Sequence, residues 1–238
     1  MKRFYKDVSV RPANDASDNH KGWRVLLDGR PIRTAGGRAQ IVPSEALARK
    51  LADEWSAQGE EIDPARFVTR DLVDFAIDAV APRTAEVIEE LLPYADTDTL
   101  CYRADPDEAL YKRQLAVWEP IVTATEARLG VSFARVSGIM HKAHPPATQE
   151  VLRRELARHD AFTLAGLKML SSLAASLIVA LNAIEDEADA RALWQAANLE
   201  EDWQVEMWGE DAEAAANRQA RLEAFELAMS VVRLAKAG

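Results

Sequence analysis

Two histidines in this sequence have a spacing that could bind a metal ion. His141 and His144 lie three residues apart, which on a helix would place both imidazoles on one face, as zinc sites require. Pro145 and Pro146 follow at once, and no cysteine or second histidine pair accompanies them. We therefore expect an exposed loop here and no bound metal.

Two neighbouring carboxylates form the second candidate. Asp96 and Asp98, separated by Thr97, could hold a cation or work as an acid and base pair. Carboxylates this close in sequence more often accept backbone N–H groups as helix caps and turn residues, so we expect a structural junction. The alternative is a metal-dependent or carboxylate-based hydrolase that uses these residues or the two histidines. It requires at least three polar groups that converge in a pocket.

Nucleophiles and phosphate-binding loops are scarce. Cys101 lies between Leu100 and Tyr102, an apolar setting that keeps a thiol protonated. The serines between residues 171 and 176 lie in an apolar helical pattern without the glycine turn that exposes a catalytic serine. Gly36-Gly37 is too short to cradle a phosphate. We predict no catalytic residue, no cofactor and no metal, and hence no enzyme.

Aromatic residues near acidic residues suggest binding instead. Trp194, Trp203 and Trp208 fall within a short stretch that also contains Glu200 and Glu201. Aromatic anchors surrounded by charges fit an interaction surface, because the aromatics supply binding energy and the charges select the partner. A core face beside a solvated acidic face fits the same pattern, so the sequence leaves both interpretations open.

Composition excludes several classes of partner. The 238 residues carry a net charge of −10, which argues against nucleic acid and anionic membranes as partners. The longest apolar run, Met169 to Leu181, is too short to cross a bilayer, so no membrane insertion is expected. Cys101 cannot form an intrachain disulfide, and no apolar signal segment follows the first residues. We expect the cytoplasm of a bacterium, or an organelle after removal of a transit peptide.

The first 43 residues have the pattern of a small antiparallel β unit. Asp28-Gly29 between Trp23–Leu27 and Arg30–Thr34 predicts a hairpin, since both turn positions favour positive φ. Phe4–Val10 and Ala39–Val42 read as further strands.

From Ser44 onward the pattern becomes helical. Ser44 is a predicted N-cap, Leu47, Leu51 and Trp55 share one face, and Gly59 is a predicted helix end. Further helices are expected to begin at Thr69 and Pro82, Pro120 is expected to end or kink a helix, and residues 131–136 read as a short strand. Later helices are expected over Thr148–His159, Ala161–Ile184, Glu187–Ala197, Leu199–Trp208 and Asp211–Ala235.

These elements predict an α+β protein with a small β-rich N-terminal domain followed by a larger, mostly α-helical C-terminal domain. We expect the first domain, with its following helices, over residues 1–95 and the second over residues 96–238.

An ordered set of short motifs runs collinearly from residue 3 to about residue 213. The motifs are Arg3-Phe4-Tyr5-Lys6, Leu27-Asp28-Gly29-Arg30-Pro31-Ile32-Arg33-Thr34, Val42-Pro43-Ser44, Ala52-Asp53-Glu54-Trp55, Ile62-Asp63-Pro64, Ala76-Ile77-Asp78, Tyr94-Ala95-Asp96-Thr97-Asp98, Trp118-Glu119-Pro120, Leu199-Glu200-Glu201, Trp203-Gln204 and Trp208-Gly209. Taken together, they resemble the family of assembly chaperones for the α subunit of the F-type ATP synthase, the Atp-twelve family of mitochondria and α-proteobacteria.

The resemblance implies a non-enzymatic chaperone with a β-rich N-terminal and a helical C-terminal domain. Such a protein holds the free α subunit until the β subunit replaces it, because an unassembled subunit exposes apolar surface that aggregates. The implied partner is the ATP synthase α subunit, and the chain is expected to be a monomer, located in the mitochondrial matrix if it comes from a eukaryote.

The resemblance also places an important acidic position on Glu200, with Glu201 adjacent. We expect Glu200 to contact the client or to orient the residues that do, within a client-binding set of Glu200, Glu201, Trp203 and Trp208. Asn198 could cap a helix that begins at Leu199, and the two carboxylates would then stabilise its first turn. Helix stabilisation alone is therefore the competing interpretation.

Overall fold

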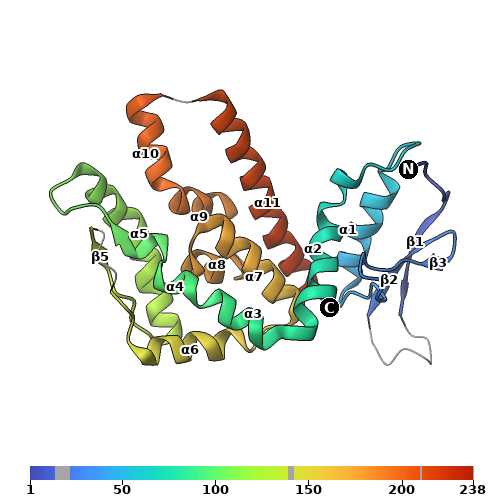
Figure 1. The fold of residues 1–238 in the computed structure, drawn as a ribbon, viewed down its shortest axis with the longest axis horizontal. Coiled ribbons are helices and arrows are strands. Elements are labelled where there is room, and N and C mark those ends of the chain that lie inside the picture. Colours follow the sequence, from blue (N-terminus) through green and yellow to red (C-terminus); the bar gives the residue numbers. More distant parts are fainter. Residues whose placement is uncertain (14–21, 139–141, 210, 238) are drawn as a thin grey trace. The chain divides into compact units, whose positions relative to one another are not determined.

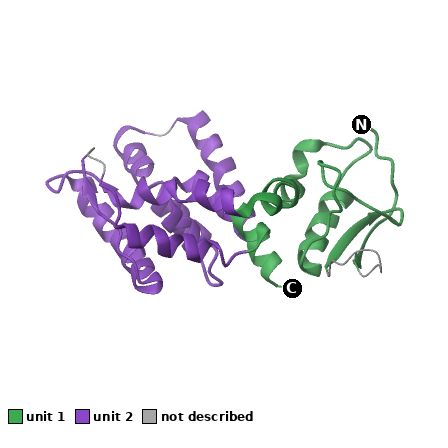
Figure 2. Cartoon of the chain, turned by 60° about the horizontal axis from the view of Figure 1, so that its bottom comes forward, with its two compact units in different colours: residues 1–84, 160–166, 230–238 green, residues 85–159, 167–229 purple. Residues whose placement is uncertain are grey.

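The computed structural model describes residues 1–13, 22–138, 142–209 and 211–237. It is an α+β fold with a small β region near the N-terminus and helices elsewhere, as the sequence predicts (Figure 1). The chain divides into two compact units, coloured separately in Figure 2. Unit 1 comprises residues 1–84, 160–166 and 230–238, and unit 2 comprises residues 85–159 and 167–229. The domain boundary at residue 95 stays a prediction.

Unit 1 begins with a three-stranded antiparallel sheet. Its strands are β1 (Val8–Pro12), β2 (Trp23–Leu27) and β3 (Arg30–Pro31), in that order across the sheet. Asp28 and Gly29 form the predicted hairpin turn, with φ of 47° and 77°. The strand expected from Phe4 begins only at Val8. The strand expected over residues 39–42 is reduced to isolated bridges, which join Ala39 to Arg33 and Val42 to Trp23.

A loop after β3 is held by two carboxylates of the following helical segment. Asp78 accepts hydrogen bonds from Thr34 Oγ1 and the Gly36 backbone N–H, both at 2.8 Å. Asp74 accepts from the Ala35 N–H at 2.9 Å. A Cβ on Gly36 would lie 2.6 Å from Asp78 Oδ2, so a side chain here would displace the carboxylate that holds the loop.

The first helix, α1 (Glu45–Ser56), starts at the predicted cap. Ser44 Oγ accepts from the Leu47 N–H at 3.0 Å, and Leu47, Leu51 and Trp55 are buried along one face. The helix ends at Ser56, so the prediction that Gly59 closes it was wrong. The cap residue Ala57 is right-handed, and its N–H bonds back to Asp53, so no left-handed glycine is needed.

The remaining helical segments of unit 1 follow one another closely. A short 3-10 turn covers Pro64–Arg66, and α2 spans Val68–Phe75. A wider turn (Ala76–Val80) and a second 3-10 turn (Ala81–Arg83) lead to α3 (Thr84–Leu91). Pro82 therefore lies just before α3, where its missing N–H costs little.

Unit 2 is built from helices and one short parallel strand pair. The pair is β4 (Tyr102–Arg103) with β5 (Val136–Ser137), so only the end of the strand expected over residues 131–136 forms. Pro120 lies inside a continuous helix and does not end it. The helices that lie wholly or mostly in unit 2 are α4 (Pro93–Asp96), α5 (Ala109–Leu129), α6 (Pro146–Leu156), α7 (Ala161–Ala174), α8 (Leu177–Ala183), α9 (Ala190–Ala197), α10 (Leu199–Trp208) and α11 (Ala212–Lys236). The beginning of α7 and the end of α11 belong to unit 1.

The single helix expected over residues 161–184 is broken in two. Ala175 adopts φ of 46°, and Ser176 caps the new helix α8 by accepting from the Val179 N–H at 3.0 Å. Asp98 accepts from the Ile178 N–H at 2.9 Å. Because these two side chains satisfy the first N–H groups of α8, the chain can restart a helix in a new direction.

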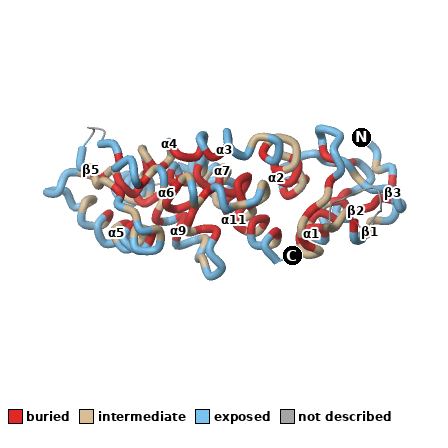
Figure 3. Tube along the Cα trace, turned by 90° about the horizontal axis from the view of Figure 1, so that it is seen from below, coloured by how far each residue is buried: buried red, intermediate tan, exposed pale blue. Residues whose placement is uncertain are grey.

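Buried residues, red in Figure 3, occur in both units. Most of these buried residues are apolar. In unit 2 the largest fully buried residues include Trp118, Leu152, Leu167 and Phe225. Within the described ranges, no helix is both long enough and apolar enough to cross a membrane.

Candidate functional site

The structure gives the paired carboxylates a structural role. Asp98 is fully buried, and it accepts from the Leu100 N–H at 3.0 Å, Ser176 Oγ at 2.7 Å and the Ile178 N–H. Burial raises its pKa to about 7, and the hydrogen bonds from Ile178 and its neighbours limit that rise. These bonds tie the junction after α4 to the start of α8. The expectation of a junction is thereby confirmed for Asp98.

Asp96 and His144 are also engaged in packing. Gln149 Nε2 donates to both oxygens of the Asp96 carboxylate, at 2.9 and 3.0 Å. His144 Nδ1 accepts from the Ala134 N–H at 3.0 Å, so its Nε2 carries the proton and donates to the Ala95 carbonyl at 2.7 Å. His144 is 6% exposed, which corrects the expectation of an exposed loop, because a neutral imidazole with both nitrogens bonded can be buried. His141 lies outside the described residues.

Neither the thiol nor the serines form a nucleophilic site. Burial, together with the nearby Asp98 charge, raises the pKa of Cys101 far above its usual range, which keeps the thiol protonated. Ser176 is used as a helix cap. In the described part of the chain, no three metal-ligating side chains gather.

The predicted binding residues lie on α10, which begins at Leu199 as expected. Leu199 is buried, and the preceding turn is tied to α5 because Trp118 Nε1 donates to the Ala196 carbonyl at 2.7 Å. Asn198 does not cap α10 with its side chain, contrary to the prediction. Its amide donates instead to the Trp194 carbonyl at 2.8 Å, which satisfies the end of α9.

Glu200 faces α5. Its Oε1 accepts from Gln114 Nε2 at 2.7 Å, and the fully buried Gln114 is itself fixed because its Oε1 accepts from the Ala104 N–H at 2.9 Å. Burial raises the pKa of Glu200, and the bond from Gln114 opposes that rise. Glu200 therefore lies in the contact between α5 and α10.

The other acidic residues of α10 are paired with arginines of α5 and α11. Arg113 forms a two-pronged ion pair with Glu206, at 2.5 and 2.8 Å, and its guanidinium lies 5.7 Å from the centre of the half-buried Trp203 ring. Arg218 pairs with Asp202, and Arg221 lies 3.7 Å from Glu201. These pairs set the position of α10 against its two neighbours.

Three arginines and one glutamine of this arrangement were not singled out from the sequence as site residues. They are Arg113, Gln114, Arg218 and Arg221. Their types and spacing are ordinary for exposed helix faces, and only the packing of α5 and α11 beside α10 pairs them with its acids.

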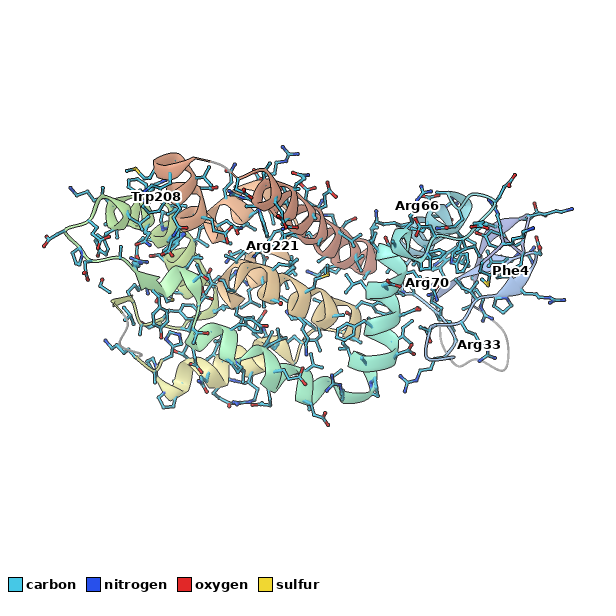
Figure 4. The ribbon with its side chains drawn as sticks, turned by 45° about the horizontal axis from the view of Figure 1, so that its top comes forward. Phe4, Arg33, Arg66, Arg70, Trp208 and Arg221 are labelled. Atoms are coloured by element: carbon cyan, nitrogen blue, oxygen red, sulfur yellow. The ribbon has the colours of Figure 1, made fainter. Side chains whose placement is uncertain are left out.

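The last turn of α10 leaves apolar side chains in solvent. Trp208 is 78% exposed and Met207 60% exposed, and Val205 precedes them. A hollow of about 460 Å³ lies between α10 and α11, lined by Val205 and Trp208 on one side and by Arg218 and Arg221 on the other. Figure 4 labels Trp208 on α10 and Arg221 on α11. Trp194, by contrast, is 2% exposed and packs on Phe225, so the tryptophan cluster divides between core and surface.

Comparison with known proteins identifies the family of this chain. The family model described as ATP12 chaperone protein matches residues 2–126. The crystal structure of Atp12 from Paracoccus denitrificans is 35% identical, with a TM-score of 0.90, and the match covers 98% of this chain and 98% of that one. The crystal structure of the Atu1473 protein from Agrobacterium tumefaciens is 38% identical, with a TM-score of 0.90, and the match covers 98% of this chain and 85% of that one. The chain belongs to the ATP12 chaperone family.

Proposed function

We propose that this chain is an assembly chaperone that binds the free α subunit of the F-type ATP synthase and prevents its aggregation until the β subunit replaces it. Family membership over the whole fold carries the proposal. The protein acts as a monomer without a cofactor, in the cytoplasm of a bacterium or in the matrix of a mitochondrion. The proposal includes no catalysis, and the engagement of Asp96, Asp98 and His144 in packing supports this part of it.

The exposed end of α10 is the surface we assign to the client. Trp208 and Met207 are neighbouring large apolar residues that are mostly exposed, and burying them against a partner would remove apolar surface from water. The hollow beside them gives an apolar client side chain a place to insert. Burial of Trp208 against an apolar client surface would supply much of the binding energy.

Glu200 acts in this proposal by positioning α10. Its hydrogen bond to Gln114 places the first turn of the helix against α5, and the ion pair between Arg113 and Glu206 fixes the helix further along. Trp203 lies under Arg113 on the same side. In this proposal the C-terminal end of α10 contacts the client. Glu201 lines the hollow, so it is the acidic residue that we expect to pair with a basic client residue.

The test is capture of purified α subunit by the tagged chain and its variants. Trp208→Ala should weaken capture by about 2 kcal/mol or more, which corresponds to roughly thirtyfold, with little change in melting temperature because the side chain is exposed. Leu115→Ala is the matched control, since Leu115 is also an exposed apolar residue of unit 2 but lies on α5. Equal capture by both variants would refute the assignment of the surface.

Substitutions at Glu200 separate positioning from direct contact. Glu200→Gln keeps an acceptor for Gln114, so positioning alone predicts nearly normal capture. A desolvated ion pair with the client would instead cost roughly 2 kcal/mol or more. Glu200→Lys removes the acceptor and should weaken capture in either case. If the wild-type chain fails to capture α subunit under any condition, the proposed function is wrong.

A further inference from the structure

Unit 1 contains a second hollow that the proposed client surface does not use. It has a volume of about 600 Å³, large enough for two or three side chains of a ligand. Its walls come from the residues before β1, the hairpin after β2 and the helices α1 and α2. Figure 4 labels three of the lining residues, Phe4, Arg33 and Arg70.

The apolar wall of this hollow is aromatic. Tyr5 meets the Trp55 ring edge-on at 5.5 Å, and Trp55 lies 4.5 Å from the ring of Phe67 behind it. Phe4 extends this wall into solvent, with 62% of its surface exposed. Phe4 makes an edge contact with Tyr5 at 5.4 Å, so it is an exposed continuation of a packed aromatic row.

Two side-chain N–H groups of the lining residues, Trp55 Nε1 and Arg70 Nε, have no hydrogen-bond acceptor among the described residues. Trp55 is 7% exposed, and both N–H groups are covered by protein atoms, so a ligand in the hollow does not reach them as the side chains stand. The Trp55 carbonyl is already engaged by the Tyr5 hydroxyl at 2.6 Å.

The rest of the lining is cationic. Arg30 and Arg33 are exposed, and neither forms an ion pair within the described ranges. Arg33 donates only to the Gly37 carbonyl, at 2.9 Å. Asp28 is the acid of the lining, and its Oδ1 accepts the backbone N–H groups of Lys6 and Asp7, at 3.0 and 2.8 Å. Arg30 lies close enough to Asp28 to help lower the pKa of that carboxyl, after the backbone N–H groups of Asp7 and Lys6. In a chain of net charge −10, two arginines that form no ion pair among the described residues, beside an aromatic wall, form a local site for an anion.

Arg70 completes the wall. Its guanidinium lies 5.0 Å from the centre of the Phe67 ring and 5.5 Å from that of Trp55, and its Nε lies 3.5 Å from an Asp74 oxygen. Stacked in this way, Arg70 covers the aromatic row and adds positive charge at the base of the hollow.

We propose that this hollow binds a segment of polypeptide in which a carboxylate side chain stands beside apolar side chains. The apolar residues would pack on Phe4, Tyr5 and Trp55, and the carboxylate would pair with Arg30 and Arg33. A peptide is favoured over a small anion because the aromatic wall offers apolar area that an inorganic ion cannot use.

The proposal rests on the proposed function only in that a chaperone's ligand is a polypeptide, and its test does not need the α subunit. The probes are two fluorescein-labelled peptides, blocked at both ends, one with a central Leu-Glu-Leu and the other with Leu-Gln-Leu. Binding to the full chain is measured by fluorescence anisotropy. We expect the glutamate peptide to bind more tightly, and the double variant Arg30→Gln, Arg33→Gln to weaken its binding by about tenfold or more.

Arg66→Gln is the matched control, because Arg66 is an exposed arginine of unit 1 that does not line the hollow. It should leave binding unchanged.

Three results would overturn the proposal. The first is equal binding of the two peptides, or no binding of either. The second is an equal effect of Arg66→Gln and the double variant, which would indicate only non-specific charge attraction. The third is competition by inorganic phosphate at the same concentration as unlabelled peptide, which would indicate a simple anion site. Each result can be read whether or not the α subunit is captured.

Discussion

Substitution of Asp98 by asparagine tests whether this carboxylate is a structural cap. Asp98 Oδ1 accepts from the Leu100 N–H and Ser176 Oγ, and Oδ2 accepts from the Ile178 N–H. In Asp98→Asn an NH₂ group replaces one of the two oxygens. In either orientation of the new side chain, this NH₂ group faces a backbone N–H, that of Leu100 or that of Ile178. Leaving buried donors unpaired costs about 1–3 kcal/mol each, and we expect a total loss of about 2–4 kcal/mol in the free energy of unfolding.

The pH dependence of the same variant gives a second measurement. Burial raises the pKa of Asp98 to about 7, above its value in the unfolded chain. Between about pH 4 and pH 7 the folded protein therefore binds a proton that the unfolded chain does not. The stabilisation from this proton is complete below the pKa of Asp98 in the unfolded chain. It is lost as the pH rises through the pKa of Asp98 in the folded chain, which lowers the free energy of unfolding by up to about 4 kcal/mol.

Asp98→Asn cannot titrate, so the stability gap between wild type and variant should narrow as the pH rises from about 4 to about 7. Urea unfolding followed by circular dichroism at several pH values measures the gap. Asp96→Asn is the control, since Asp96 is only half-buried and its carboxylate is bonded to the Gln149 amide. Wild-type stability in Asp98→Asn at about pH 4, where the gap should be widest, would refute the capping role. A gap that stays constant with pH would refute the raised pKa and show that the donors keep the carboxylate ionised.

Two further substitutions test the positions of the loop after β3 and of α10. Gly36→Ala should lower the unfolding free energy by about 1–3 kcal/mol, because the new Cβ would lie 2.6 Å from Asp78 Oδ2. Gly59→Ala, whose new Cβ would meet its nearest atom at 4.0 Å, should leave stability nearly unchanged, and equal urea midpoints for the two variants would contradict this reading. Arg113→Ala removes the ion pair to Glu206 and the contact over Trp203, so hydrogen exchange across residues 199–208 should accelerate while exchange in α7 does not. Unchanged exchange in α10 would show that Glu200 and the α11 arginines hold the helix by themselves.

Local sequence determined the elements whose cause lies within a few residues. The Asp28-Gly29 hairpin forms because the turn needs positive φ at both positions, and α1 begins at Ser44 because its hydroxyl caps the helix three residues on. The start and end of α10 at Leu199 and Trp208 likewise followed from its pattern. The ordered motifs also indicated the family before any contact was known.

Tertiary structure decided which polar residues face which partners. Asp98 meets Ser176 and Ile178 from almost eighty residues away, and that meeting breaks the helix expected over residues 161–184. His144 is buried because its ring bonds the Ala95 carbonyl, again distant in sequence.

The same holds for the binding surface on α10. The sequence shows Trp203 and Trp208 in one acidic stretch, but it does not show that Trp203 faces α5 and that Trp208 faces solvent. That division depends on Arg113 and Gln114 of α5, which approach α10 only in the folded chain. Periodicity within a helix reports which residues share a face, but the partner of that face is set by packing between helices far apart in sequence.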